Sequence, residues 1–343
     1  MMRWIATLLL AAALPTQADV SAPAEREAYL AYVVAAARVE GNLTSDAALL
    51  RLLELQADIY EHVPPEQRSP GEVSLRAEAD VLHARLSEKL RAVEADHPEL
   101  LARGLGCKDQ AATDLECDQR KQRLAEVAGD NAYYHLALMA YAWSGGDAAA
   151  YLAHARAAAA AGSYASPYTD YYRGLLERFR QVPANVAPGF GEDTGLPRGA
   201  VMAMALSTAY AMPPFQGFIG PCREAEGELR EHCLAIARLQ LASSQTPIET
   251  SLAASVIEAL GSEQEASAAR EKRRIAFWRI EQAAQLFQQA GDAAPPVGVA
   301  DYFEDYGTLG ELEATRRLLL ANGRSASPPQ AWSSSLSGPP AGP

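Results

Sequence analysis

Apolar residues recur every three to four positions along most of this chain. One stripe runs through residues 44–65, following the potential cap residues Thr44 and Ser45, and a second runs through residues 73–98. This recurrence places side chains on one helix face, and no segment alternates at period two as a strand would. The pattern therefore predicts an all-α protein. The stripes contain Leu49, Leu52, Leu53, Gln56, Ile59 and Tyr60, then Leu75, Ala79, Leu82, Leu86, Leu90 and Val93.

Later segments continue the helical pattern. Pro247 follows a break and suits the first turn of a helix, because its missing N–H has no partner there anyway. The further helices are expected within residues 166–183, 199–212, 229–243, 247–261, 262–289 and, as a short pair, 302–323.

A helical pair is predicted in the middle of the chain. Residues 132–144 are apolar around nearly the whole helix circumference, which indicates a buried helix. The Gly145-Gly146-Asp147 sequence ends this helix and supplies a cap for the next. Residues 148–161 contain ten alanines in fourteen positions, which favours helix and close approach of a partner. We expect a tight antiparallel hairpin.

This hairpin resembles a tetratricopeptide unit. Tyr133 stands where that repeat has its large aromatic residue, Leu136-Ala137 match its Leu-Gly pair, and the turn precedes an alanine-rich second helix. The turn falls about two residues late and no proline closes the unit. The resemblance covers residues 133–162 only and implies an array of antiparallel α-hairpins used for protein contacts. More broadly, the chain looks like uncharacterised exported bacterial helical proteins.

The start of the chain predicts export. Arg3 precedes an uninterrupted apolar run from Trp4 to Leu14, and small residues surround a cleavage point after Ala18. The run is shorter than the roughly 20 residues that cross a bilayer. We interpret residues 1–18 as a signal peptide and expect a periplasmic or extracellular protein without a membrane anchor.

Composition narrows the class of partner. The chain has a formal net charge of -13, and 49% of its residues are hydrophobic. This balance is typical of a globular chain and repels nucleic-acid phosphates and anionic lipids. The basic stretches at residues 118–123 and 270–274 have acids nearby and are expected on solvated helix faces. The partner is therefore expected to be a protein or an envelope component.

The four cysteines predict two local disulfides. Cys107 and Cys117 stand ten positions apart, and Cys222 and Cys233 stand eleven apart. Four cysteines allow three pairings, and local pairing is the most economical. A zinc site would favour two cysteines two residues apart or a histidine at ligand spacing. We therefore expect Cys107–Cys117 and Cys222–Cys233.

Composition also predicts domain boundaries. Residues 183–197 contain three prolines and three glycines without a helical stripe, which indicates a linker or crossing loop between helical domains at 19–182 and 198–321. Residues 322–343 hold 14 Ser, Pro or Gly residues and are expected to be a flexible tail, ordered only where Trp332 docks.

No motif for catalysis, a cofactor or a metal stands out. The catalytic Glu-Ser dipeptide of soluble lytic transglycosylases, which are also exported and helical, does not occur. His135 and His154 lie on opposite arms of the hairpin and could meet. The acids Asp301, Glu304 and Asp305 could form a carboxylate cluster, although acids in a first turn ordinarily stabilise the helix dipole.

Four tyrosines form a candidate binding surface: Tyr164, Tyr168, Tyr171 and Tyr172. Tyrosine is enriched at recognition surfaces, but these residues could instead fill volume beside the small alanines. Two functions remain. The first is a noncatalytic exported helical binding protein, which a broad tyrosine-lined groove would favour. The alternative is an enzyme with a site of scattered residues, which a pocket of convergent acids or histidines would favour.

Overall fold

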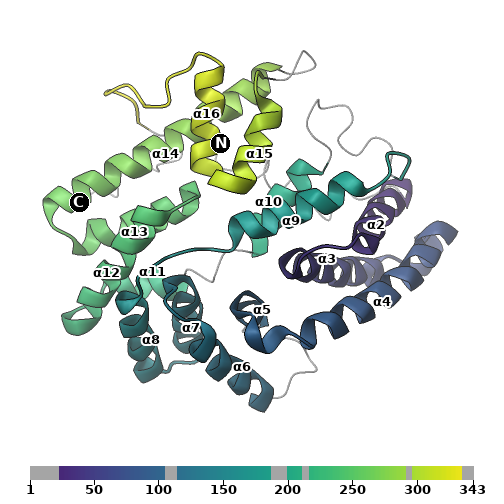
Figure 1. Ribbon diagram of the computed structural model, residues 1–343, viewed down its shortest axis with the longest axis horizontal. Coiled ribbons are helices and arrows are strands. Elements are labelled where there is room, and N and C mark those ends of the chain that lie inside the picture. The colour runs from purple at the N-terminus through teal and green to yellow at the C-terminus, as the bar shows by residue number, and fades with distance from the viewer. Residues whose placement is uncertain (1–22, 105–113, 187–198, 211–215, 291–295, 334–343) are drawn as a thin grey trace. The chain divides into compact units, whose positions relative to one another are not determined.

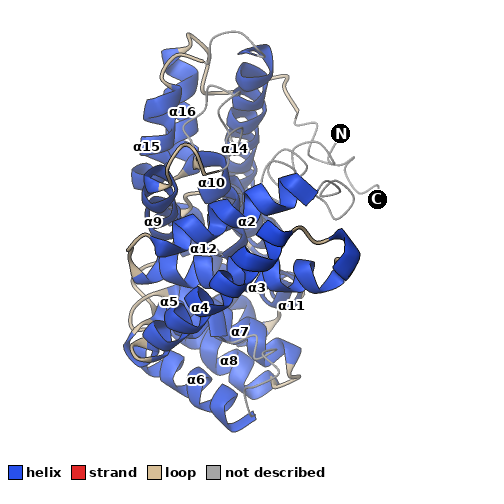
Figure 2. Ribbon diagram, turned by 90° about the vertical axis from the view of Figure 1, so that its right-hand side faces the viewer, coloured by secondary structure: helices blue, strands red, loops and turns tan. Residues whose placement is uncertain are grey.

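The computed structural model describes residues 23–104, 114–186, 199–210, 216–290 and 296–333. Within these ranges the protein is helical, as Figure 2 shows, and contains no strand, only an isolated bridge between Asn131 and Ser163. The predicted all-α class is confirmed. The predicted signal peptide at residues 1–18 lies outside the described residues.

The chain divides into two compact units. Unit 1 comprises residues 1–94 and 168–211. Helices α2, α3 and α4 pack against one another, and α9 contacts α2, α3 and α10. The helices of unit 1 are α2 (Pro23–Arg38), α3 (Leu43–His62), α4 (Pro70–Arg91), α9 (Tyr168–Gln181) and α10 (Ala200–Tyr210).

Unit 2 comprises residues 95–167 and 212–343, and Figure 1 follows its helices by colour. Helix α13 packs on α12 and α14, and α16 packs on α14 and α15. The helices of unit 2 are α5 (Pro98–Gly104), α6 (Asp114–Val127), α7 (Ala132–Ser144), α8 (Ala148–Ala160), α11 (Gln216–Arg223), α12 (Gly227–Ser243), α13 (Pro247–Leu260), α14 (Glu263–Ala290), α15 (Val299–Leu309) and α16 (Glu311–Ala321).

This division differs from the predicted domains at 19–182 and 198–321. Each unit takes segments from both sides of the predicted linker, because α9 and α10 pack with α2 and α3 rather than with their chain neighbours in unit 2. Most of the linker, residues 187–198, lies outside the described residues. Composition identified a break in the helical pattern, but the grouping depends on packing between distant segments.

Helix starts follow local capping chemistry. The Asn42 side chain accepts a hydrogen bond from the Ser45 N–H at 2.8 Å and caps α3, so the predicted Thr44 or Ser45 cap is wrong. Asparagine is as strong a cap as serine and lies where the backbone is still extended. Helix α13 begins at Pro247, as predicted, with a capping box formed by Thr246 and Glu249.

Helices α7 and α8 confirm the predicted bounds to within one residue. Gly146 takes the left-handed conformation, with φ of 71°, and the Asp147 side chain caps α8 by accepting from the Ala150 N–H. Helix α7 is buried on most of its circumference, although Trp143 is exposed. The two helices pack against each other. Their relation to tetratricopeptide units and to an antiparallel hairpin array stays a prediction.

The disulfide between Cys222 and Cys233 is present, and it joins α11 to α12 with a Cα–Cα distance of 5.5 Å. Both cysteines are buried in the core of unit 2. Cys107 lies outside the described residues, so the pairing of Cys107 with Cys117 stays a prediction. No described helix is long and apolar enough to cross a membrane.

Part of the tail that was predicted to be flexible, residues 322–343, is placed on the structure. Residues 322–333 are placed against α14, where Trp278 donates a hydrogen bond to the Ser325 carbonyl and packs against Trp332. The predicted docking of Trp332 is therefore confirmed, and side chains of α14 fix this part of the tail as well. Residues 334–343 lie outside the described residues.

Candidate binding site

Helices α15 and α16 form the walls of a surface hollow. Gly310 joins them directly, with a φ of 81° that glycine adopts at little cost. A Cβ at this position would come within 2.7 Å of the Gln245 Cβ, so the turn also needs glycine for space. The Leu312 N–H donates to the Gln245 carbonyl at 3.0 Å and fixes the start of α16 beside the start of α13.

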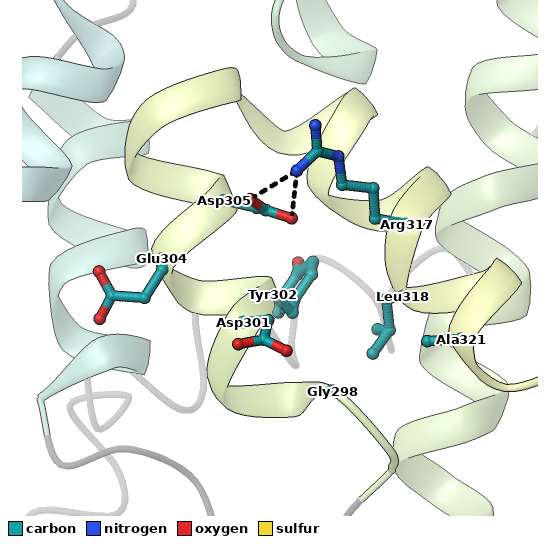
Figure 3. A pocket seen from close by; sticks show the side chains of 8 residues that line it. All are labelled: Gly298, Asp301, Tyr302, Glu304, Asp305, Arg317, Leu318 and Ala321. Carbon is teal, nitrogen blue, oxygen red and sulfur yellow. Dashed lines mark hydrogen bonds and ion pairs between the residues drawn. The ribbon is translucent and has the colours of Figure 1, made fainter.

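The hollow encloses about 350 Å³. Figure 3 shows Asp305 on α15 facing the basic side chain of Arg317 on α16, with Asp301 and Glu304 elsewhere on α15. Carboxylates therefore outnumber the single cation in the lining by three to one. The residues that line it are Gly298, Asp301, Tyr302, Glu304, Asp305, Arg317, Leu318 and Ala321.

The cation of the lining is already paired. Arg317 Nη1 donates to both carboxylate oxygens of Asp305 at 3.1 and 3.3 Å, and Arg317 Nε lies 3.3 Å from Glu313. Arg316 donates hydrogen bonds to both carboxylate oxygens of Glu313, and these hydrogen bonds lower the pKa of that carboxyl. The guanidinium therefore neutralises Asp305 and leaves the rest of the lining acidic.

Asp301 is the uncompensated acid of the hollow. It is exposed in the first turn of α15, and no ion pair to it is found among the described residues. In Figure 3 the Asp301 carboxylate lies near the middle of the hollow, whereas Glu304 points away from it. The three carboxylates therefore do not converge on one point, as catalytic or metal-ligating acids would.

The base of the hollow is apolar. Tyr302 is buried and packs edge-on against Phe303 and Tyr306, with ring centroids 5.0 and 5.9 Å apart. Burial raises the pKa of the Tyr302 hydroxyl, so it stays protonated. Leu318 on α16 is buried beside it. The hollow thus offers an apolar floor beneath a negatively charged rim.

A second group of acids lies inside unit 2. Glu249 is buried and accepts hydrogen bonds from the Tyr164 hydroxyl at 3.2 Å and the Gln245 N–H at 2.9 Å. Glu311, at the start of α16, has no ion-pair partner among the described residues. Burial, followed by repulsion from Glu249, raises the pKa of Glu311 to about 8. Glu311 is therefore largely protonated at neutral pH.

The structure buries all four candidate tyrosines. Tyr164 belongs to unit 2, where Gln240 Nε2 donates to its hydroxyl at 3.2 Å, while Tyr168, Tyr171 and Tyr172 lie on α9 in unit 1. None of the four is exposed by more than 4%. They therefore form no exposed surface, which agrees with their alternative interpretation as packing residues.

The histidine pair lies in the core region of α7 and α8. Burial lowers the pKa of both His135 and His154, and His135 adds a smaller repulsion at His154. His135 Nε2 lies 3.4 Å from the Gly129 carbonyl. Among the described residues, no group of three or more His, Cys, Asp or Glu side chains is arranged to hold a metal ion.

Sequence reasoning identified part of the hollow. Asp301 does occupy a first helical turn, as the dipole interpretation expected, and Asp305 belongs to the same acidic stretch. The contribution of Arg317 was missed because it reaches Asp305 only through the turn at Gly310. The sequence does contain a signal for this ion pair: Arg317 follows Asp305 by twelve positions, with the turn glycine Gly310 between them.

Comparison of the chain with protein-family models, curated proteins and solved structures finds no match. The geometry of the site must therefore carry any functional argument.

Proposed function

We propose that this protein is a noncatalytic exported helical binding protein, and that the hollow between α15 and α16 receives a cationic group of a protein or an envelope component. The observation that carries the proposal is the charge of the lining, in which Arg317 pairs with Asp305 while Asp301 has no ion-pair partner among the described residues. A net negative concave surface attracts cations and raises their local concentration.

The shape of the hollow supports a lysine-like or arginine-like group. Its volume of about 350 Å³ lies near the lower end of ligand pockets, which span roughly 300–1,000 Å³. The alkyl stem of such a side chain would pack on Tyr302 and Leu318, while its charged head would stay beside Asp301. Both contacts are available on a single amphipathic group.

The proposal can be tested with spermidine, a flexible aliphatic polycation, by calorimetry at low and high salt. Asp301→Asn should weaken binding about fivefold, the equivalent of roughly 1 kcal/mol for one charge in a water-exposed site. Glu231→Gln removes an exposed charge on α12 that does not line the hollow and is the matched control. Equal weakening by both variants would mean nonspecific attraction to an acidic chain and would reject the site.

One observation favours the alternative of an enzyme. The raised pKa of Glu311 beside Glu249 resembles the separation of pKa values in acid–base pairs. Against it, Glu311 does not line the described hollow. The test measures the release of soluble products from envelope polysaccharide by the wild type and by Glu311→Gln. Release that is lost in Glu311→Gln would favour the enzyme. Equal release by the two proteins would exclude a catalytic role for Glu311.

A further inference from the structure

Three cationic side chains in unit 1 gather around a single carboxylate. Helix α3 packs against both α4 and α9 (Figure 1), and Asp46 in the first turn of α3 contacts side chains from both. Arg178 of α9 donates to Asp46 Oδ1, and Lys89 of α4 lies 2.6 Å from Asp46 Oδ2. Arg85 stands one turn before Lys89 on α4 and has no ion pair among the described residues. One carboxylate therefore serves the whole cluster.

Arg85 acts on Arg178 through space. Burial lowers the pKa of Arg178, Asp46 opposes that change, and repulsion from Arg85 lowers the pKa further. Glu177, which is exposed on α9, is the remaining charged neighbour and has the smallest influence. The two guanidinium groups therefore lie close enough to repel each other. Positive charge is locally in excess, although the chain as a whole carries a net charge of -13.

The buried guanidinium of Arg178 also has donors without acceptors. Its side chain is 1% exposed, and neither Nε nor Nη1 has a hydrogen-bond partner among the described residues. A Cβ built on Gly41 would fall 2.6 Å from Nη2 and closer still to Nε, so this edge of the guanidinium faces Gly41 and Asp46. Nη1 points away from that edge. Buried donors of this kind normally have a partner, which is a protein group, a water molecule or an ion.

The partner that suits Nη1 is an anion. A water molecule offers an oxygen, but only an anion also relieves the repulsion between Arg85 and Arg178. An oxyanion carries several oxygens on one small group, so one oxygen can accept from Nη1 while others reach the cations of α4. Hydrogen bonds from arginine to carboxylate or phosphate are roughly twice as strong as those between neutral groups. The chemistry of the cluster therefore favours a carboxylate or a phosphate group.

We propose that Arg178, Arg85 and Lys89 form a binding site for a small oxyanion, a carboxylate or phosphate group, beside the first turn of α3. The ligand enters along α4, where Arg85 is exposed and the Lys89 side chain is 49% exposed. Only a small group reaches Nη1, because Arg178 and Asp46 are both buried. The site belongs to unit 1 and the acidic hollow to unit 2, so this proposal does not depend on the proposed function.

The experiment is calorimetric titration of the full-length folded protein with sodium phosphate and, separately, with sodium acetate. Sodium chloride keeps the ionic strength constant, so that general screening is the same throughout. One oxyanion per chain should bind, with a Kd on the order of 1 mM or tighter. Saturable binding of phosphate alone assigns a phosphate group to the site, and saturable binding of acetate alone assigns a carboxylate. Saturable binding of neither anion would overturn the proposal.

Exposed cations of α4 supply the variants, because their replacement leaves the buried pair of Arg178 and Asp46 in place. Arg85→Gln and Lys89→Gln should each weaken binding about fivefold, since each removes one charge from a partly water-exposed site. Arg91→Gln is the matched control: Arg91 is exposed on the same helix and donates to the Ser87 carbonyl of its own turn. Its Kd should equal that of the wild type.

The comparison separates a site from general attraction. Arg91→Gln changes the net charge as much as the other two variants do, so equal weakening by all three would mean nonspecific attraction and would overturn the proposal. Unchanged binding in both Arg85→Gln and Lys89→Gln would overturn it as well. Circular dichroism of each variant, compared with that of the wild type, ensures that a loss of binding is not a loss of fold.

Discussion

In unit 1 the buried carboxylate of Asp46 lies against two cations, whereas in unit 2 the buried carboxylate of Glu249 lies against neutral donors and a second acid. Arg178 donates to Asp46 within unit 1, and Lys89 Nζ lies 2.6 Å from its other oxygen. Glu249 instead accepts from a tyrosine hydroxyl and backbone N–H groups.

The difference bears on the pKa of the second acid in unit 2. In unit 2, Glu249 and Glu311 lie in the first turns of α13 and α16, where the helix dipole attracts negative charge. A helix N-terminus supplies only about half an elementary charge, which is less than the full positive charge of an arginine or lysine. Burial, followed by repulsion from Glu249, therefore raises the pKa of Glu311 to about 8.

The largest expected effect comes from breaking the buried pair in unit 1. Arg178→Met keeps much of the side-chain volume but leaves Asp46 buried with only Lys89, whose side chain is 49% exposed. We expect a loss of about 3–5 kcal/mol of unfolding free energy, measured by chemical denaturation. Lys89→Met is the control and should cost under about 1 kcal/mol. Equal costs for the two variants would contradict the assigned role of Arg178.

The next effect concerns the covalent constraint of unit 2. Replacing Cys222 and Cys233 together by Ser should lower the unfolding free energy by about 2–4 kcal/mol, because the unfolded chain regains the freedom of the closed loop. Thermal unfolding of the oxidised and reduced wild-type protein supplies the comparison. A double variant as stable as the oxidised protein would show that the bridge adds nothing to unit 2.

The third effect is a pH dependence specific to Glu311. Its pKa is raised from 4.5 to about 8 on folding, so the folded state binds more protons between these values. The stability that it contributes is complete below pH 4.5 and is lost as the pH rises through about 8. Because Glu311 keeps some solvent contact, we expect a difference of roughly 2 kcal/mol across this window.

Glu311→Gln should remove that slope. Glu313→Gln on the same helix is the control: its pKa is lowered by Arg316, so it titrates below the window and should leave the slope unchanged. Subtracting the wild-type curve cancels the contribution of the histidines. Parallel curves for wild type and Glu311→Gln between pH 5 and 8 would exclude the raised pKa.

The sequence pattern was enough to predict the bounds of helices whose end signals lie within a few residues of those ends. The bounds of α7 and α8 followed from the apolar stretch, the two glycines and the Asp147 cap, and α13 followed from Pro247. Helix α11 was not predicted, because its eight residues include two glycines and Pro221. It packs closely on α7, where a Cβ at Gly217 would come within 2.5 Å of the Ala140 Cα.

The sites depend on contacts that no local pattern encodes. Glu249 and Glu311 are 62 positions apart and are brought together by the contact between Gln245 and the turn at Gly310. Trp332 was expected to dock, but its partner Trp278 is 54 positions earlier in the chain and was not identified from the sequence. Sequence supplied candidate chemistry, and tertiary packing selected which residues meet.

The smallest expected effect compares the two capping boxes, one in each unit. Ser69 caps α4 and Thr246 caps α13. In each case the glutamate three residues after the cap accepts a hydrogen bond from the backbone N–H of the cap residue. Removing either hydroxyl with Ala should cost about 1 kcal/mol. Glu72 remains held by Arg26 at 2.8 Å, so Ser69→Ala should leave the pH dependence of stability unchanged.

Thr246→Ala should act differently because, in the part of the chain that the structure describes, no cation pairs with Glu249. Loss of the Thr246 hydroxyl, which accepts from the Glu249 N–H at 3.1 Å, loosens the first turn of α13. Glu249 then gains solvent, its repulsion of Glu311 weakens, and the pKa of Glu311 falls toward its ordinary value. The midpoint of the pH-dependent loss of stability should therefore shift to lower pH in Thr246→Ala and return in Thr246→Ser, which keeps the oxygen. Stability measured against pH for these two variants and Ser69→Ala checks this, and the same midpoint in all three would remove the link between the cap and the acid pair.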